Sequence, residues 1–332
     1  MPTLLSIAAI LGGFVLLIKG ADWLVDGASS IAQRLNIPDL VIGLTIVAFG
    51  TSAPELIVNI IASLRGNADI AIGNIVGSNI ANTLLILGVA AMLFPLRVQR
   101  STVLKEIPFS ILAALVLFLM ANDQLIDGYS ASEIGRGDGL ILMCFFCIFL
   151  YYTFGMASAG KAEDLSAPKR STLMATGMMA IGLVGLGIGG EFVVRGATQI
   201  AELLGISQAL IGLTIVAVGT SLPELMTSVI AALKHKPDIS VGNIVGSNIF
   251  NIFWILGASA VIQPLPFSAA INPDLLVVIG SAVLLFLFIH TGGIHKRLLF
   301  WRQRDGHIIT RVEGALLLAC YVGYVCFAAL RG

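Results

Sequence analysis

The chain contains few charged residues and few cysteines. Of its 332 residues, 11% are charged and 57% are hydrophobic, and the mean hydropathy is +0.97. Soluble domains carry about 25% charged residues, so this composition excludes a soluble globular protein and predicts a polytopic membrane protein. The net charge is zero and no long basic block occurs, which excludes a nucleic-acid-binding protein.

Four cysteines, Cys144, Cys147, Cys320 and Cys326, all fall within apolar runs. No second Cys/His cluster accompanies the C-x-x-C spacing of the first pair, so we expect buried small apolar residues and no zinc or redox site. The first apolar stretch lacks a basic region and an A-x-A site, so we expect it to remain as a membrane helix. No nucleophile–base pair or metal triad is present, so we expect neither a cofactor nor an enzyme.

Long apolar runs dominate what is present. A membrane-spanning helix needs about 20 apolar residues, and the sequence predicts ten spans in an all-α membrane protein. They lie at about 4–32, 39–64, 70–94, 103–121, 138–158, 172–203, 208–233, 239–263, 274–291 and 312–330.

The sequence also repeats itself. IGLTIVAFGTSAPEL at 42–56 returns as IGLTIVAVGTSLPEL at 211–225, and GNIVGSNIANTLLILG at 73–88 returns as GNIVGSNIFNIFWILG at 242–257. Both pairs are 169 positions apart, and 30 of the 48 positions in 41–88 are identical to their counterparts. We therefore expect a duplicated unit, with a first repeat at 1–158, a cytoplasmic linker at 159–171 and a second repeat at 172–332.

Five spans in each repeat would give the two repeats opposite orientations, which is the inverted-repeat architecture of many transporters. With both termini outside the cell membrane, 14 of the 19 Lys and Arg residues fall in inner loops. This distribution agrees with the positive-inside rule and supports the predicted orientation.

Each repeat places a G-T-S-x-P-E segment inside an apolar span. Proline removes a backbone donor and clashes with the carbonyl four residues earlier, so we expect the second and seventh spans to break near Pro54 and Pro223. Broken helices at membrane depth are tolerated where they are buried or line a cavity. The break would free backbone carbonyls near the two acids, Glu55 and Glu224.

The expected site consists entirely of oxygen ligands. It contains the carboxylates of Glu55 and Glu224, hydroxyl groups, amide oxygens and the freed carbonyls. Hard cations such as Ca²⁺ prefer such ligands, and the formal charge of −2 matches one Ca²⁺, two Na⁺ or two protons. Competition of these ions for one pocket is the physical basis of antiport. The full set of candidate ligands is Ala48, Thr51, Ser52, Glu55, Ser78, Asn82, Ala217, Thr220, Ser221, Glu224, Ser247 and Asn251.

Other charges and glycines in the spans suggest structural roles. For Asp22, Asp26 and Glu191 we expect local ion pairs, with Arg195 one turn from Glu191. The glycine-rich run 182–190 has no preceding strand, which argues against a nucleotide site. It predicts a helix that packs closely against another or slides along it.

On the two G-T-S-x-P-E and two G-N-I-V-G-S-N motifs, the chain resembles the cation/Ca²⁺ exchanger superfamily, and among its members the prokaryotic Na⁺/Ca²⁺ exchangers. The resemblance covers all ten predicted spans. It implies a core of spans two, three, seven and eight, across which spans one and six slide. It also implies that Glu55 and Glu224 are shared ligands of Ca²⁺ and Na⁺, and that the four serines and the carbonyls of Ala48, Thr51, Ala217 and Thr220 complete the sites. Many members of the family carry Asp at the position of Asn251, so the asparagines at 82 and 251 leave the stoichiometry and the choice of Na⁺ or H⁺ open.

These observations predict a monomeric antiporter of the cell membrane that exchanges Ca²⁺ for Na⁺. The alternatives are Ca²⁺/H⁺ exchange, K⁺-dependent Na⁺/Ca²⁺ exchange and a cation channel. The hydroxyl groups that flank the acids favour Na⁺, because protons need no additional oxygens. Two copies that meet at one site fit a transporter better than a channel, whose filter repeats around a symmetric pore.

Overall fold

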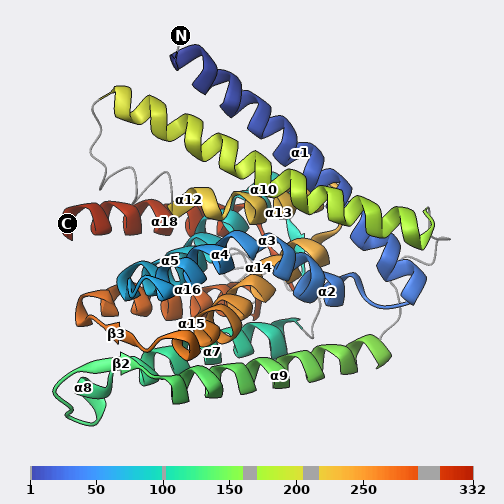
Figure 1. Cartoon of the computed structure of the whole chain (residues 1–332). Helices are drawn as coiled ribbons and strands as arrows, with labels where there is room; N and C mark the ends of the chain where they lie inside the picture. Colours follow the sequence, from blue (N-terminus) through green and yellow to red (C-terminus); the bar gives the residue numbers. More distant parts are fainter. Residues whose placement is uncertain (1, 99–101, 160–169, 205–216, 291–306, 332) are drawn as a thin grey trace.

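The computed structural model describes residues 2–98, 102–159, 170–204, 217–290 and 307–331. Almost all of these residues are helical (Figure 1). The helical elements of the first half are α1 (Pro2–Leu35), α2 (Asp39–Ile42), η1 (Gly43–Val47), α3 (Ala48–Thr51), α4 (Ala53–Leu64), α5 (Ala68–Ile80), η2 (Ala81–Ile86), α6 (Leu87–Leu93), η3 (Thr102–Glu106), α7 (Ile107–Met120), α8 (Asp123–Ile126) and α9 (Arg136–Ala159). Those of the second half are α10 (Thr172–Leu203), α12 (Ala217–Thr220), α13 (Leu222–Leu233), α14 (Pro237–Ile249), η5 (Phe250–Leu256), α15 (Gly257–Ile262), η6 (Ala269–Ile271), α16 (Asn272–His290) and α18 (Arg311–Arg331).

Two short antiparallel strand pairs connect loops of the helical bundle by backbone hydrogen bonds. Strand β1 (Leu96–Arg97) pairs with β4 (Ile308–Ile309), and β2 (Ser132–Ile134) pairs with β3 (Leu265–Phe267). Each pair joins a loop of the first half to a loop of the second half. The strands are too short to change the fold class, which is that of an all-helical membrane protein.

Seven helical runs of the described chain are long and apolar enough to cross a membrane, and the bent pair Asp39–Thr51 and Ala53–Leu64 makes an eighth. The predicted spans 103–121 and 208–233 correspond to the shorter helices α7, of 14 residues, and α13, of 12 residues. Much of the first half of span 208–233 lies outside the described residues. The count of ten spans therefore stays a prediction.

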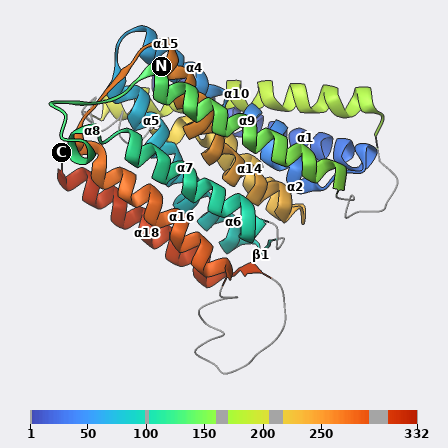
Figure 2. The same cartoon turned by 90° about the horizontal axis from the view of Figure 1, so that it is seen from below.

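The core of the molecule lies around the two runs that contain the G-N-I-V-G-S-N motifs. Run 68–93 is 78% buried over its most apolar window and run 237–262 is 83% buried, whereas the runs of α1 and α18 are 28% and 17% buried. The motif helices α5 and α14 therefore form the centre. The helices α1, α9, α10 and α18 lie at the periphery, where the bilayer would contact them (Figures 1 and 2).

Glycines form a close seam between α1 and α10, which run side by side in both views (Figures 1 and 2). A Cβ atom on Gly20 would lie 2.8 Å from the Gly182 carbonyl oxygen, and one on Gly13 would lie 2.7 Å from the Gly189 carbonyl oxygen. Within each helix these glycines are seven residues apart, so they return to the same face. The close packing predicted from the glycine run 182–190 is confirmed, and the partner helix is α1.

The expectation for the cysteines was wrong. Cys144 and Cys147 on α9, like Cys320 and Cys326 on α18, are exposed on the protein surface. In a bilayer the outer faces of peripheral helices contact lipid, so an apolar run does not by itself indicate burial in protein.

Candidate ion-binding site

The second span breaks where the proline predicts. Helix α3 ends at Thr51, Ser52 leaves the helical conformation with φ −81° and ψ 9°, and α4 begins at Ala53 with a bend of 47°. Pro54 falls in the first turn of α4, where its missing N–H needs no partner. The break does not free the Ala48 carbonyl, which accepts the Ser52 N–H at 3.0 Å and the Thr51 hydroxyl at 3.3 Å.

The second repeat has the same local structure. Ser221 separates α12 from α13 with φ −86° and ψ 6°, and Pro223 again lies in the first turn of the following helix. Two residues of the candidate set, Ala217 and Thr220, form the ends of the short helix α12, directly before this break. The sequence-based prediction of both breaks is confirmed.

The breaks bring the two glutamates into one buried site. Glu55 and Glu224 are each 1% exposed, and each accepts a hydrogen bond from the serine of the opposite repeat. Ser52 Oγ donates to Glu224 Oε1 at 2.9 Å, and Ser221 Oγ donates to Glu55 Oε1 at 3.3 Å. No Lys, Arg or His side chain pairs with either glutamate in the described part of the chain, so the two carboxylates share the site without a basic partner.

The serines of the motif helices complete this polar ring. Ser78 Oγ lies 3.3 Å from Glu55 Oε1 and 3.4 Å from Ser221 Oγ. Ser247 Oγ lies 3.0 Å from Ser52 Oγ. The contacts between the repeats come in pairs whose residue numbers are shifted by 169, Ser52–Glu224 with Ser221–Glu55 and Ser52–Ser247 with Ser221–Ser78.

Four oxygens of the site lack a hydrogen-bond partner among the described residues. They are Glu55 Oε2, Glu224 Oε2, Asn82 Oδ1 and Asn251 Oδ1, and all are buried. A buried polar atom without a partner is costly. Four such acceptors of matching chemistry, two of them on carboxylates, form a ligand set suited to a hard cation.

Sequence reasoning missed the residues that orient the two amides. Asn82 Nδ2 donates to Asn248 Oδ1 at 3.1 Å, and Asn251 Nδ2 donates to Asn79 Oδ1 at 2.9 Å. These bonds fix the orientation of both amides, and neither Oδ1 has a hydrogen-bond partner among the described residues. Asn79 and Asn248 are the last residues of G-N-I-V-G-S-N, and their identity in both repeats is the signal that could have identified them.

A second pair of asparagines contacts the backbone carbonyls of the two glutamates. Asn74 Nδ2 donates to Asn59 Oδ1 at 2.7 Å and lies 3.5 Å from the Glu55 carbonyl. Its counterpart Asn243 Nδ2 lies 3.4 Å from the Glu224 carbonyl, and Asn243 Oδ1 accepts from the Thr51 hydroxyl at 3.0 Å. Thr51 is thereby tied to the site through Asn243.

The two motif helices have unequal surroundings. Gly242 and Gly246 on α14 face the backbone of residues 40–44, and a Cβ atom on either would lie 2.8–3.2 Å from its atoms. Their counterparts Gly73 and Gly77 have no atom within 4 Å of such a Cβ and line a cavity of about 660 Å³ that also contains Asp274. Space is therefore available beside α5, and it is filled beside α14.

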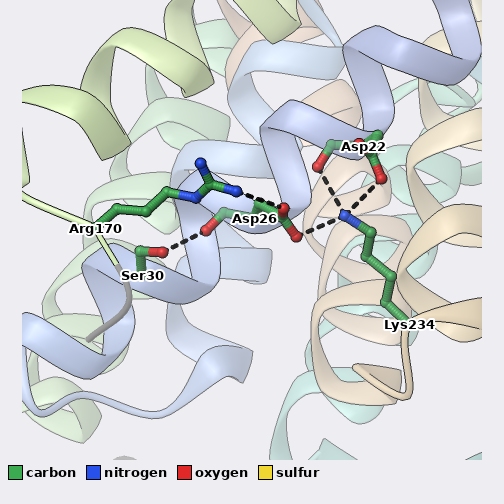
Figure 3. Close-up of polar contacts among 5 residues, drawn as sticks. All are labelled: Asp22, Asp26, Ser30, Arg170 and Lys234. Atoms are coloured by element: carbon green, nitrogen blue, oxygen red, sulfur yellow. Dashed lines mark hydrogen bonds and ion pairs between the residues drawn. The ribbon is translucent and has the colours of Figure 1, made fainter. Parts of the chain in front are cut away.

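Three other acids of the spans, Glu191, Asp22 and Asp26, form ion pairs, but only the first forms the local pair that was expected. Glu191 pairs with Arg195 on the same helix. Asp22 and Asp26, for which a local pair was expected, instead reach Lys234 and Arg170 on other elements (Figure 3). They lie apart from the glutamate site.

The comparison with known proteins agrees with this geometry. The model of the sodium/calcium exchanger protein family matches residues 5–155 and 174–330, one segment in each half. The chain belongs to the sodium/calcium exchanger family. It is therefore a membrane transporter and not an enzyme.

Relatives of this exchanger match it along nearly the whole chain. Sodium/calcium exchanger MaX1 of Methanosarcina acetivorans is 34% identical over 95% of this chain and 96% of its own length. Inner membrane protein YrbG of Escherichia coli is 37% identical over 85% of this chain and 89% of its own length. The solved structure of the sodium-calcium exchanger NCX_Mj has a TM-score of 0.80 and 33% identity, covering 97% of this chain and 98% of that one.

Proposed function

We propose that this protein exchanges Ca²⁺ for Na⁺ across the cell membrane at the site between Glu55 and Glu224. The observation that carries the proposal is the set of four buried oxygens that have no hydrogen-bond partner among the described residues, two on the carboxylates of Glu55 and Glu224 and two on the amides of Asn82 and Asn251. Their formal charge of −2 is neutralised by one Ca²⁺ or by two Na⁺, so binding of one ion excludes the other. The family, and the relatives named for Na⁺ and Ca²⁺, support the same ions.

In this proposal the ligands are the twelve residues predicted from the sequence. Glu55 and Glu224 are shared by both ions, and the serines, asparagines and carbonyls supply the remaining oxygens. Repeats 1–158 and 172–332 have opposite orientations over ten spans, with both termini outside, and the monomer is the working unit. The exchange of contacts at an offset of 169 residues supports this arrangement, because inverted repeats pack about such a two-fold axis.

The coupling ion is tested by flux. Purified protein in liposomes should take up radiolabelled Ca²⁺ when a Na⁺ gradient is imposed at clamped pH, and it should take up little when only a pH gradient is imposed. Uptake driven by the pH gradient alone would establish Ca²⁺/H⁺ exchange, with the two glutamates protonated in turn. Flux that needs no counter-ion would indicate a channel, and flux that also requires K⁺ would indicate K⁺ cotransport.

A second test adds the carboxylate found in many relatives. Asn251→Asp makes the pocket charge −3, so we expect tighter Ca²⁺ binding, altered Na⁺ dependence and altered voltage dependence of exchange. It also replaces the amide nitrogen that donates to Asn79 Oδ1 with an oxygen, so two acceptors would face each other. The Asn79 amide could turn its nitrogen toward the new carboxylate, but it would then lose its 3.2 Å hydrogen bond to the Asn248 carbonyl. We therefore expect the unfolding midpoint to fall, since loss of such a bond costs about 1–3 kcal/mol.

The matched variant is Asn82→Asp, which adds the same charge in the other repeat. Its neighbour Asn248 can turn more easily, because its nitrogen bonds the Thr83 hydroxyl at 2.9 Å, and a hydroxyl can donate as well as accept. Asn82→Asp should change ion dependence with a smaller loss of stability. Transport unchanged from wild type in both variants would show that the third carboxylate does not set the coupling.

A further inference from the structure

A cluster of charged residues joins α1 to the end of α13 (Figure 3). Lys234 Nζ lies 2.7 Å from Asp22 Oδ1 and 2.5 Å from Asp26 Oδ1, and it donates to the Asp22 carbonyl at 3.0 Å. Arg170, which precedes α10, lies 3.3 Å from Asp26 Oδ2. Two carboxylates on one helix thus face a lysine at the C-terminal end of another.

The two bases differ in which part of the molecule they join to α1. Arg170 leads into α10, which packs against α1 along the glycine seam, and its carbonyl accepts a hydrogen bond from Arg34 of α1 at 3.0 Å. The Arg170–Asp26 pair therefore lies within the α1/α10 unit. Lys234 directly follows α13, which carries Glu224, so its ion pairs connect the α1/α10 unit to the ion-binding core.

The internal repeat supplies a counterpart for each of these residues. At an offset of 169, Lys234 corresponds to Arg65, Asp22 to Glu191 and Asp26 to Arg195. Arg65 and Lys234 occupy the same position, directly after the last turn of α4 and of α13. Yet Glu191 pairs with Arg195 of its own helix, and no ion pair joins it to Arg65 in the described chain. Among the described residues, ion pairs therefore join the α1/α10 unit to the core at the Lys234 end and not at the Arg65 end.

A transporter with one central site must open to the two sides in turn, and inverted repeats achieve this by exchanging their conformations. We propose that the ion pairs of Lys234 with Asp22 and Asp26 hold closed the side at which α13 ends, and that Arg65 takes the matching place against Glu191 when the opposite side is closed. The inference rests on the proposed function only in requiring alternating exposure of the site.

The strength of the cluster suits this role. The side chains of Lys234, Asp22 and Asp26 are 27%, 38% and 35% exposed, so water screens their attraction, and such pairs are weak enough to break in every cycle. At the other end, Arg195 occupies the position equivalent to Asp26. It pairs with Glu191 and would compete with Arg65 for that carboxylate. The closure proposed for Lys234 is therefore the stronger of the two, and the protein should favour it.

The test uses Lys234→Met with a reporter cysteine, Ala231→Cys, in a background in which the four native cysteines are replaced by alanine. Ala231 is fully buried in α13 and belongs to the hydrophobic cluster that contains the α1 residues Leu24 and Ala28. We expect its labelling by a membrane-impermeant maleimide, in permeabilised liposomes, to become about two- to fivefold faster, as loss of partly exposed ion pairs implies. The double variant Asp22→Asn/Asp26→Asn should give the same increase, and its combination with Lys234→Met should add nothing.

Three controls separate a closure from general loosening. Lys234→Arg keeps the charge and should label as wild type. Arg170→Met removes the basic partner of Asp26 within the α1/α10 unit and should not accelerate labelling. Arg65→Met makes the repeat-equivalent change and should slow labelling or leave it unchanged, because it weakens the opposite closure.

Unchanged labelling in Lys234→Met, or an equal acceleration in Arg65→Met, would overturn the inference. The labelling rate does not depend on which ions are transported. A finding of Ca²⁺/H⁺ exchange in the flux assay would therefore refute the proposed coupling and leave this result intact.

Discussion

Ca²⁺ flux should fall by two orders of magnitude or more in Glu55→Gln, and equally in Glu224→Gln. Glutamine keeps the size of the side chain and removes one of the two charges that neutralise the cation. A divalent ion would then be left with an uncompensated charge in a buried site, and removing one partner of a buried ionic contact costs about 3–5 kcal/mol. Both carboxylates are 1% exposed, so little water is available to compensate.

Two measurements check this prediction, namely radiolabelled Ca²⁺ flux in liposomes and the rise in unfolding temperature on addition of Ca²⁺. Wild-type protein should be stabilised by Ca²⁺, and both variants should lose that response. Glu133→Gln changes an exposed residue of strand β2, is the matched control and should behave as wild type. Near-normal flux in either variant would remove that glutamate from the site.

Gly20→Ala should reduce exchange to about a tenth or less and lower the unfolding midpoint by several degrees. The added Cβ would lie 2.8 Å from the Gly182 carbonyl oxygen and 2.9 Å from the Leu186 nitrogen. Both are backbone atoms, so relief requires α1 and α10 to separate, and overpacking of this kind costs about 1–3 kcal/mol. Thermal unfolding in detergent and Ca²⁺ flux measure the two effects.

Gly12→Ala is the control on the same helix. No atom lies within 4 Å of its added Cβ, so it should retain flux and stability. The second repeat offers the same comparison, with Gly189→Ala disruptive and Gly187→Ala tolerated, because only the first of these faces the Gly13 carbonyl, at 2.8 Å. If Gly20→Ala and Gly12→Ala behaved alike, the close seam would have no importance for transport.

Local chemistry explains what the sequence predicts well. The breaks at Ser52 and Ser221 follow from the prolines at 54 and 223, each of which lacks an N–H and clashes with the carbonyl four residues earlier. The meeting of Glu55 with Glu224 follows from the duplication. Such rules involve neighbouring residues or a fixed offset. They need no knowledge of how distant helices are arranged.

The interactions that sequence reasoning missed depend on tertiary packing. Asn79 and Asn248 bridge α5 and α14 between residues 166–172 positions apart, and no local pattern shows which amide atom faces the site. Local partners were expected for Asp22 and Asp26, but the packing of α13 against α1 places Lys234 within ion-pair distance of both. The cysteines were misplaced because the surroundings of a peripheral helix are as apolar as its neighbours in the core.

The glycine seam also sets a length scale for relative movement within the membrane. Seven residues of α-helix rise about 10 Å, so the next register that matches glycines to backbone lies about that far along the helix axis. At any intermediate register, buried side chains such as Leu17 would replace hydrogen atoms at the points of closest approach between the two backbones. If α1 moved a few ångströms along α10, the two helices would have no close-packed register to adopt. A movement on that scale must therefore carry both helices together.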